Sequence, residues 1–569
     1  MRYMKYFLAA GLILSSALTS SCSLLYKQDD EITPPQTTPA ITVGTAATEG
    51  DPNVPQFVET APLPVVSGDM PNVIPPATEP PVSIPEAPEQ SVGEDGKIID
   101  DWMSGLNITQ KEDPAELYEQ FGIDPVMREG YYNMICADSN LPVIHISTEE
   151  KREILSLDDY VNCIVEVMNC DDIYKLTASA GIRVRGNASA YYGDVDQIRT
   201  SPVPYRIKFN KKQSMLGLNG FASCKSWVLL RTYETGVRDH LAFRIAKAIN
   251  DGAYYVSDST FVQLYVNEKY AGMYLLCEQT QENSQRIDIT EAKDGYEGTD
   301  IGYLVELDNY ASKDDGPFFL LNYNLEEITD VYGTARVPRK YTYSVKNDLY
   351  CDEQLKYIER YFEVAWEISM RAIKYGEFYT FDEELNLVLA QDMFGSAYEC
   401  INAVIDVQSV VDMYMTYEIT NDQDVGGGSF FFAVDFSETS KYPRLTMVAP
   451  WDFDWAYSDF SSDADGGLYA ARFKDDFFIN GDEHHIGYGD RSNPWLILFY
   501  SADWFQGLVK ETWSERVGYI REVMDEVEQT AVDYSDDFNK DGTRRAARAV
   551  ATVNWARERL DYLGTLWGQ

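Results

Sequence analysis

The composition of the chain changes abruptly near residue 98, and this change limits the part of the chain that can fold. Residues 23–98 are rich in Pro, Thr, Glu, Val and Ala, most densely so in residues 74–81. Such a segment buries too little apolar surface to offset the entropy lost on ordering. We therefore expect a disordered stalk, semi-rigid where proline is dense, that holds the folded part away from a membrane.

The first residues predict export. Arg2 and Lys5 precede an apolar stretch, residues 7–18, which ends in small residues before Cys22. This is the pattern of a secretion signal, and it is too short for a membrane span of about twenty apolar residues. Residues 1–22 resemble a bacterial lipoprotein signal, which implies an extracytoplasmic protein anchored at the cell surface by a lipid on Cys22. Ordinary cleavage and an uncleaved anchor remain alternatives.

The charge of the chain excludes one large class of partners. Asp and Glu number 92 against 47 Lys and Arg, a formal net charge of -45. Such a surface repels phosphate backbones, so we expect no binding to nucleic acid. Seven cysteines follow Cys22 without any C-x-x-C pair, which predicts neither a zinc site nor a disulfide framework. A bond between Cys163 and Cys170 remains an alternative to free thiols.

Hydrophobic periodicity predicts strands first and helices later. An adaptor, residues 99–135, contains one short helical pattern and precedes the strand signals of residues 141–209. The further patterns are a helix at 236–249, a hairpin with strands at 261–266 and 270–276, helices at 352–375 and 405–420, strands at 430–434 and 445–449, and closing helices. This order favours an α+β fold with two lobes and a cleft between them.

Two acidic motifs carry the strongest chemical signal. They are Asn-Asp-Gln-Asp at residues 421–424 and Pro-Trp-Asp-Phe-Asp-Trp at residues 450–455, separated by an apolar run and a turn. The layout is typical of phosphoryl transfer, in which one carboxylate orients a hydroxyl group and another, after a strand, holds magnesium. A glycosidase that uses Asp424 and Asp452 as paired carboxylates is an alternative.

Several ordered motifs resemble those of one family, the spore-coat-protein-H-like (CotH) kinases, which are atypical relatives of protein kinases. The resemblance covers residues 141–458. Its motifs are RGN at 185–187, PYRIKF at 204–209, LGL at 216–218, KSWVLL at 225–230, YVNEKYAGMYLLCE at 265–278, GYLVELD at 302–308 and PWDFD at 450–454. It implies an atypical kinase-like, two-lobed domain over residues 136–569 that uses ATP and Mg²⁺.

The resemblance also implies roles for the acidic residues. Asp424 matches the catalytic aspartate, which orients the attacking hydroxyl group, although a turn before Gly426 is the plain structural explanation. Asp452 matches the aspartate that holds magnesium. Asp454 either joins the same metal or only forms a hydrogen bond beside it.

Nucleotide-binding residues follow from analogy with a kinase. Lys208, on a predicted strand, would contact the phosphates, and Glu278 would orient it. Arg183 and Arg185 would clamp phosphates. For Lys208, an ordinary strand lysine that faces solvent remains the alternative. For Arg183 and Arg185, structural ion pairs remain the alternative.

Three departures from the family pattern bear on activity. RGN is followed by Ala-Ser-Ala instead of Ser-Ser-Trp, Ser429 stands where a kinase loop carries a metal-binding asparagine, and the glycines of residues 426–428 predict a mobile loop. We expect an extracytoplasmic, ATP-dependent kinase acting on Ser or Thr of a secreted or surface protein. The alternative is a noncatalytic surface module, a pseudokinase, that binds a protein or glycan.

Overall fold

The computed structural model describes residues 112–232, 237–308, 311–313, 316–457, 467–474 and 491–568, with the backbone of strands β1 (Ser91–Val92) and β2 (Ile98–Ile99). All of these lie in one compact unit, Pro85–Gln569. The predicted signal peptide with Cys22 lies outside the described residues, as does the predicted stalk apart from β1 and β2, which pair antiparallel. No helix in the described ranges is long and apolar enough to cross a membrane.

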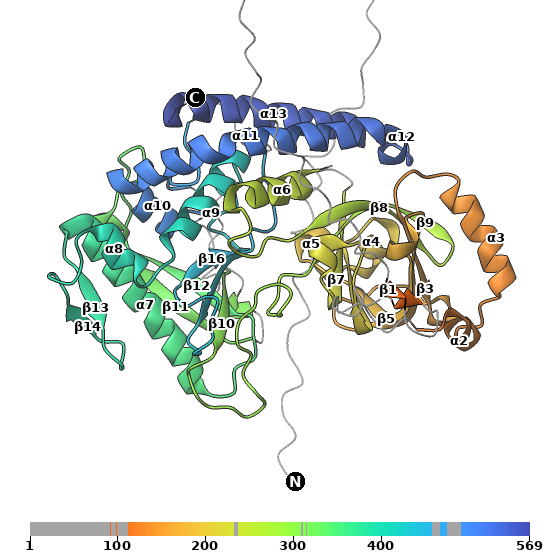
Figure 1. Ribbon diagram of the computed structural model, residues 1–569, viewed down its shortest axis with the longest axis horizontal. Helices are drawn as coiled ribbons and strands as arrows, with labels where there is room; N and C mark the ends of the chain where they lie inside the picture. The colour runs from red at the N-terminus through yellow and green to blue at the C-terminus, as the bar shows by residue number, and fades with distance from the viewer. Residues whose placement is uncertain are drawn as a thin grey trace, which may run out of the picture. The chain divides into compact units, whose positions relative to one another are not determined.

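Seven strands close into a barrel in the order β3-β4-β5-β6-β7-β9-β8 (Figure 1). They are β3 (Val143–Thr148), β4 (Val161–Met168), β5 (Leu176–Val184), β6 (Tyr205–Gln213), β7 (Cys224–Arg231), β8 (Ser259–Val266) and β9 (Lys269–Glu278). Every neighbouring pair is antiparallel except β3 and β8, whose parallel pairing closes the barrel. The predicted antiparallel strands are therefore present, but the sequence did not predict their closure.

Alternating burial shows why these segments form a barrel. In β5, Ala178, Ala180, Ile182 and Val184 are buried in the barrel core, and the residues between them are only partly buried. A strand presents successive side chains to opposite faces, so this alternation directs one apolar row inward. The predicted hairpin between β8 and β9 is confirmed, with Asn267 and Glu268 at positive φ, as a tight turn of this kind requires.

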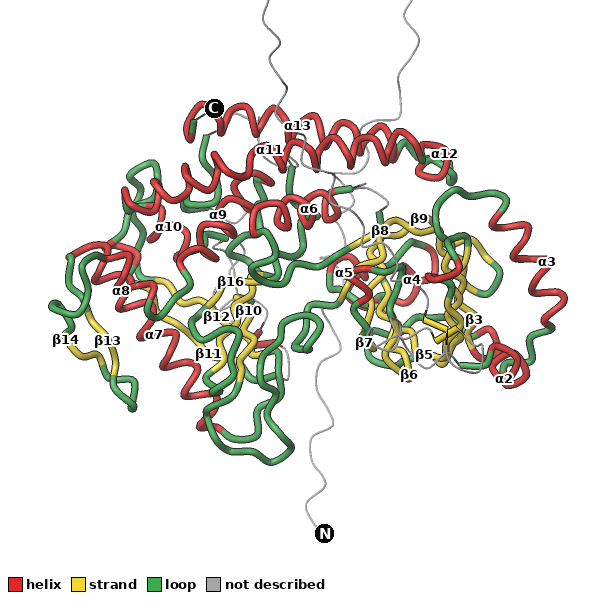
Figure 2. Tube along the Cα trace, viewed as in Figure 1, coloured by secondary structure: helices red, strands yellow, loops and turns green. Residues whose placement is uncertain are grey.

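The second group of strands is a five-stranded antiparallel sheet in the order β11-β12-β10-β15-β16 (Figure 2). Its members are β10 (Gly302–Leu307), β11 (Phe318–Tyr323), β12 (Arg339–Val345), β15 (Phe430–Asp435) and β16 (Thr446–Val448). Helix α7 (Asp352–Tyr375) packs on β11, and helix α9 (Val407–Thr420) packs on β16. Both helices and strands β15 and β16 match the predicted segments closely.

The remaining elements are mostly helical. They are α2 (Pro114–Gln120), α3 (Pro125–Cys136), α4 (Val195–Thr200), α5 (Leu218–Phe221), α6 (Arg238–Asn250), β13 (Tyr379–Phe381), β14 (Leu387–Leu389), α8 (Ala397–Asn402), α10 (Pro494–Tyr500), α11 (Asp503–Asp533), α12 (Ser535–Phe538) and α13 (Arg545–Trp567). The strand-rich N-terminal part and the helical C-terminal part confirm the α+β class. The predicted adaptor includes α2 and most of α3, whose Ile135 packs with Val143 of the barrel.

Helix α6 connects the barrel with the helical part of the unit. It contacts β8, α9 and α11, and α11 runs beside α13 along one edge (Figure 1). Phe243 on α6 stacks on Trp451 with ring centroids 5.3 Å apart. This contact brings the second acidic motif next to α6.

Candidate active site

The two acidic motifs meet because the elements that precede them pack together. Helix α9 ends at Thr420, and the first motif follows it, while the second motif follows β16. The backbone N–H of Tyr457 donates to the carbonyl oxygen of Thr420 at 2.8 Å, and the rings of Tyr417 and Phe453 lie 5.2 Å apart. The structure thus confirms that the segments around Asp424 and Asp452 are neighbours.

Asp424 combines partial exposure with a strong ionic partner. Its Oδ1 accepts a hydrogen bond from the guanidinium of Arg491, and its side chain is 37% exposed. Loss of hydration inside the protein raises the pKa of Asp424 to about 6, while Arg491 opposes the rise and Asp452 adds to it. A carboxylate with such a pKa can gain or lose a proton near neutral pH.

Asp452 is exposed and has an unusual backbone conformation. Its φ is 67°, in the left-handed region that costs a residue with a Cβ some strain. The hydroxyl of Ser429 lies 3.4 Å from its Oδ2. The surrounding protein raises the pKa of Asp452 by desolvation, and the nearby charge of Arg185 and the Ser429 hydrogen bond oppose this rise. Ser429 stands at the position where a kinase loop carries a metal-binding asparagine. Its hydroxyl faces Asp452, the aspartate predicted to hold the metal.

Three further carboxylates surround this pair. Asp239, in the first turn of α6, accepts a hydrogen bond from the backbone N–H of Phe453 at 2.9 Å. Burial and then the charge of Asp452 raise its pKa to about 6. The pKa values of Asp422 and Asp454 are raised well above the usual range, first by burial and then by neighbouring carboxylates. Such an accumulation of negative charge is costly unless a cation joins it.

The donor set fits a magnesium ion that phosphate oxygens help to hold. Among the described residues, no group of three or more His, Cys, Asp or Glu side chains is arranged as a complete metal cage. Mg²⁺ needs no such cage, because it is commonly held by one or two carboxylates together with phosphate oxygens and water. Asp452 and Asp454 are the carboxylates that the sequence predicts for this ion. Asp422 Oδ1 is buried without a hydrogen-bond partner in the described part of the chain.

Cationic side chains reach the cluster from three distant segments. Arg185 follows β5 of the barrel and lies over the Trp451 ring at 5.8 Å. Arg491 lies over the Trp455 ring at 4.3 Å. Lys474 is 6% exposed, and burial lowers its pKa to about 7 although the charge of Asp422 opposes that change. Sequence reasoning missed Lys474, Arg491 and Asp239, because no motif marks them.

The glycines after Asp424 have a steric explanation. A Cβ on Gly427 would lie 2.0 Å from Asp424 Oδ1, and a Cβ on Gly426 would lie 2.2 Å from the carbonyl oxygen of Ser492. Both glycines are buried. They allow the carboxylate and the segment that carries Arg491 to approach the loop closely. Close packing therefore accounts for Gly426 and Gly427, whereas Gly428 has open space around it, and the mobility of the loop stays a prediction.

The residues predicted to hold nucleotide separate into two groups. Arg185 lies with the aspartates. Arg183 instead donates to the carbonyl oxygens of Leu157 and Val184, and its guanidinium lies 5.4 Å from the centre of the Tyr160 ring. Its contacts are thus with the loop beside its own strand.

The suggested pairing of Lys208 with Glu278 is wrong, and strand register explains why. Lys208 on β6 lies opposite Ser226 of β7, whereas Glu278 on β9 lies opposite Trp227. Consecutive residues of β7 point to opposite faces of the barrel wall, so Lys208 and Glu278 point to opposite faces as well. Lys208 is exposed and forms no ion pair within the described ranges.

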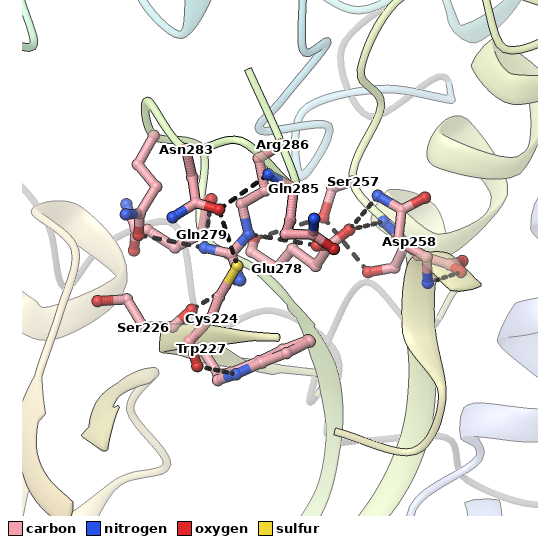
Figure 3. Close-up of polar contacts among 12 residues, drawn as sticks. Cys224, Ser226, Trp227, Ser257, Asp258, Glu278, Gln279, Asn283, Gln285 and Arg286 are labelled. Carbon is pink, nitrogen blue, oxygen red and sulfur yellow. Dashed lines mark hydrogen bonds and ion pairs between the residues drawn. The ribbon is translucent and has the colours of Figure 1, made fainter. Parts of the chain in front are cut away.

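Glu278, the last residue of β9, belongs to a buried polar network (Figure 3). Its Oε1 lies 3.2 Å from Nε of Arg286, and neither side chain is exposed. Its Oε2 accepts hydrogen bonds from Asn219 at 2.7 Å and from the backbone N–H of Asp258 at 3.1 Å. Arg286 also donates to the carbonyl oxygen of Ser226 at 2.8 Å. The network connects β7, β9 and the loop after β9.

We expect Arg286→Met to lower the free energy of unfolding by about 3 kcal/mol or more, because it leaves the Glu278 carboxylate buried without its counter-charge. Chemical denaturation measures the change. The double variant Glu278→Met/Arg286→Met should recover much of the loss. Lys175→Met, which breaks the exposed pair with Asp172, is the matched control and should cost at most about 1 kcal/mol. If Arg286→Met and Lys175→Met lowered the free energy of unfolding by the same amount, the structural role of the Glu278–Arg286 pair would be contradicted.

A comparison with family models agrees with the geometry. The model described as CotH kinase protein matches residues 182–562, well over half of the chain, and so confirms the resemblance inferred from the motifs. The matched region includes the whole carboxylate cluster and the cations around it. A kinase family implies the use of a nucleotide and a metal in general terms. No curated protein matches the chain.

Proposed function

The chain belongs to the CotH kinase family, and from this membership we propose that it is an extracytoplasmic, ATP-dependent kinase. It would transfer the γ-phosphate of ATP to serine or threonine of a secreted or surface protein. The observation that carries the proposal is the position of Asp424, with a pKa of about 6, beside Asp452 in a cluster of carboxylates and cations. This is the chemistry that phosphoryl transfer requires.

Five residues of the cluster have roles in this proposal. Asp452, with Asp454, would hold Mg²⁺, which supplies positive charge to the phosphate oxygens. Asp424 would accept the proton of the attacking hydroxyl group, and Arg491 would orient its carboxylate. Arg185, which lies beside Asp452, would contact the nucleotide phosphates.

The proposal extends to the arrangement of the domain and its location. The barrel supplies Arg185, and the sheet and helices supply the aspartates, so the two parts would act as the two lobes of an atypical kinase. A lipid on Cys22 would anchor the protein to a membrane, and residues 23–98 would act as a stalk that places the kinase at the cell surface.

Two observations favour the noncatalytic alternative, a pseudokinase that binds a protein or glycan. Arg491 already pairs with Asp424, and Ser429 replaces the asparagine expected near the metal. If this ion pair persists when nucleotide binds, Asp424 is less able to accept a proton. A transfer assay separates the two functions.

The assay uses ATP labelled in the γ-phosphate, Mg²⁺ and the secreted and surface proteins of the source cell. The kinase proposal predicts label on serine or threonine of an added protein, dependent on Mg²⁺, and no transfer from ATP labelled in the α-phosphate. Absence of transfer, together with tight binding to one of the added proteins, would support the noncatalytic alternative instead.

The pH dependence of transfer should report the ionisation of Asp424. Only the ionised carboxylate accepts a proton, and its pKa is raised to about 6. We therefore expect the rate to fall by about tenfold per pH unit as the pH drops below about 6. A pH profile of kcat/KM measures this. A rate that stays constant from pH 7 to pH 5 would contradict the assigned role.

A further inference from the structure

Four lysines on the barrel form a group without a counter-charge. Lys208, Lys211 and Lys212 belong to β6, and Lys225 belongs to β7, the strand that pairs with β6. All four side chains are exposed, and none forms a hydrogen bond or an ion pair within the described ranges. Neither strand contains an Asp or a Glu. We call these four lysines the basic surface.

Such a group is unexpected in this chain. Asp and Glu outnumber Lys and Arg by 92 to 47, and other exposed lysines, such as Lys151, Lys175 and Lys441, pair with a carboxylate. Lysines often protect the exposed edge of a sheet, but β6 lies between β5 and β7 in a closed barrel and is not an edge strand. The fold therefore gives no reason for four unpaired lysines here, which points to an anionic occupant.

The N-terminal part of the chain reaches the barrel beside this surface. The carboxylate of Glu112 accepts hydrogen bonds from the backbone N–H of Ser179 at 2.7 Å and from its hydroxyl at 2.8 Å. Ser179 is part of β5, and its hydroxyl also accepts a hydrogen bond from Asn210 Nδ2 at 2.8 Å. Asn210 is the β6 residue directly before Lys211 and Lys212. These contacts hold Glu112 next to the strand that carries three of the four lysines.

The chain that precedes Glu112 is acidic. Residues 94–101 contain one lysine and four carboxylates, two before β2 and two after it. The carboxylates are Glu94, Asp95, Asp100 and Asp101. Residues 102–111 connect this segment to Glu112, and a chain of about ten residues spans up to about 33 Å when extended. Because adjacent strands are only about 4.8 Å apart, the whole basic surface lies within reach of residues 94–101.

We propose that the acidic segment, residues 94–101, binds the basic surface of its own chain. Opposite charges supply the attraction, and the contact at Glu112 keeps the segment at an effective concentration in the millimolar range, as short tethers do. Surface ion pairs that are individually weak then suffice to hold it at low ionic strength. The bound segment fixes the direction in which the predicted stalk leaves the barrel. This inference does not depend on kinase activity.

Cross-linking of the full chain with a carbodiimide, which joins a lysine amine to a carboxylate in contact with it, tests the inference. Mass spectrometry of the peptides should find residues 94–101 joined to lysines of the basic surface. In a mixture of isotopically light and heavy protein, both joined peptides should come from one molecule. The yield should fall by about fivefold in about 1 M salt, where the screening length is only about 3 Å. The control is Lys510 of α11, which is exposed and unpaired in the described part of the chain and should not join the segment.

Two matched variants separate the effect of charge from that of proximity. Lys208→Glu/Lys211→Glu should lower the yield at the remaining Lys212 and Lys225 by about fivefold or more, because it replaces two attractions with two repulsions. Lys208→Arg/Lys211→Arg removes the same two amines but keeps their charge, so the yield at Lys212 and Lys225 should stay near that of wild type.

The inference is overturned if the two variants give equal yields, if Lys510 joins the segment as often as the basic surface does, or if no link to the segment forms. Links between light and heavy molecules would overturn it as well. They would assign the basic surface to contact with a second copy of the chain.

Discussion

Replacing Asp424 with asparagine is expected to lower kcat for phosphoryl transfer by about 10²- to 10⁴-fold, the contribution that a positioned general base usually makes. The substitution keeps the size of the side chain and an oxygen that accepts the hydrogen bond from Arg491. It removes only the ability to take up a proton. Affinity for ATP should therefore remain near that of wild type, which calorimetry measures on the same preparation.

The control for this substitution is Asp392→Asn, which alters an exposed carboxylate outside the cluster and should leave kcat unchanged. Transfer by Asp424→Asn at the wild-type rate would show that Asp424 is not the base. Equal losses of kcat and of ATP affinity would instead assign it to nucleotide or metal binding.

Replacing Asp452 with asparagine should weaken magnesium-dependent binding of ATP by about 100-fold or more. Loss of a group that only supports a metal ligand already costs about 10- to 100-fold in affinity, and Asp452 is predicted to be a ligand. Asparagine is the appropriate replacement because Asp452 has a φ of 67°, and asparagine tolerates this conformation better than most residues. The backbone at Asp452 should therefore stay in place.

The measurement is the dependence of ATP affinity on magnesium concentration. The same titration of Asp454→Asn decides between the two roles left open for Asp454. A loss equal to that of Asp452→Asn assigns a metal ligand, and a smaller loss assigns a supporting hydrogen bond. Undiminished magnesium-dependent binding by Asp452→Asn would contradict the metal assignment.

Much of the local structure could be predicted from the sequence, because it depends on local patterns. Helix α7 and the hairpin of β8 and β9 follow the periodicity of their own residues. The proximity of Asp424 and Asp452 follows from their places after α9 and β16, two elements that pack together. The family motifs then assigned chemistry to these two positions.

The errors and omissions of the predictions from sequence concern contacts between residues that are distant in the chain. The parallel pairing of β3 with β8 closes the barrel, yet about a hundred residues separate the two strands and no local pattern specifies it. Glu278 pairs with Arg286 and not with Lys208, because the registers of β6, β7 and β9 place Lys208 on the other face.

The same reason explains why sequence reasoning missed several cations of the site. Lys474 lies 50 positions after Asp424, and Arg491 lies 67 positions after it. Neither stands in a recognisable motif, and their contacts become visible only in the folded chain.

Titration of ATP into the wild-type protein, with and without magnesium, is the most direct test of the central claim that the carboxylate cluster is a site for magnesium and nucleotide. The account predicts that ATP binds and that its binding requires magnesium. A well-folded protein that binds no ATP, or binds it equally well without magnesium, would contradict this claim and favour the noncatalytic surface module.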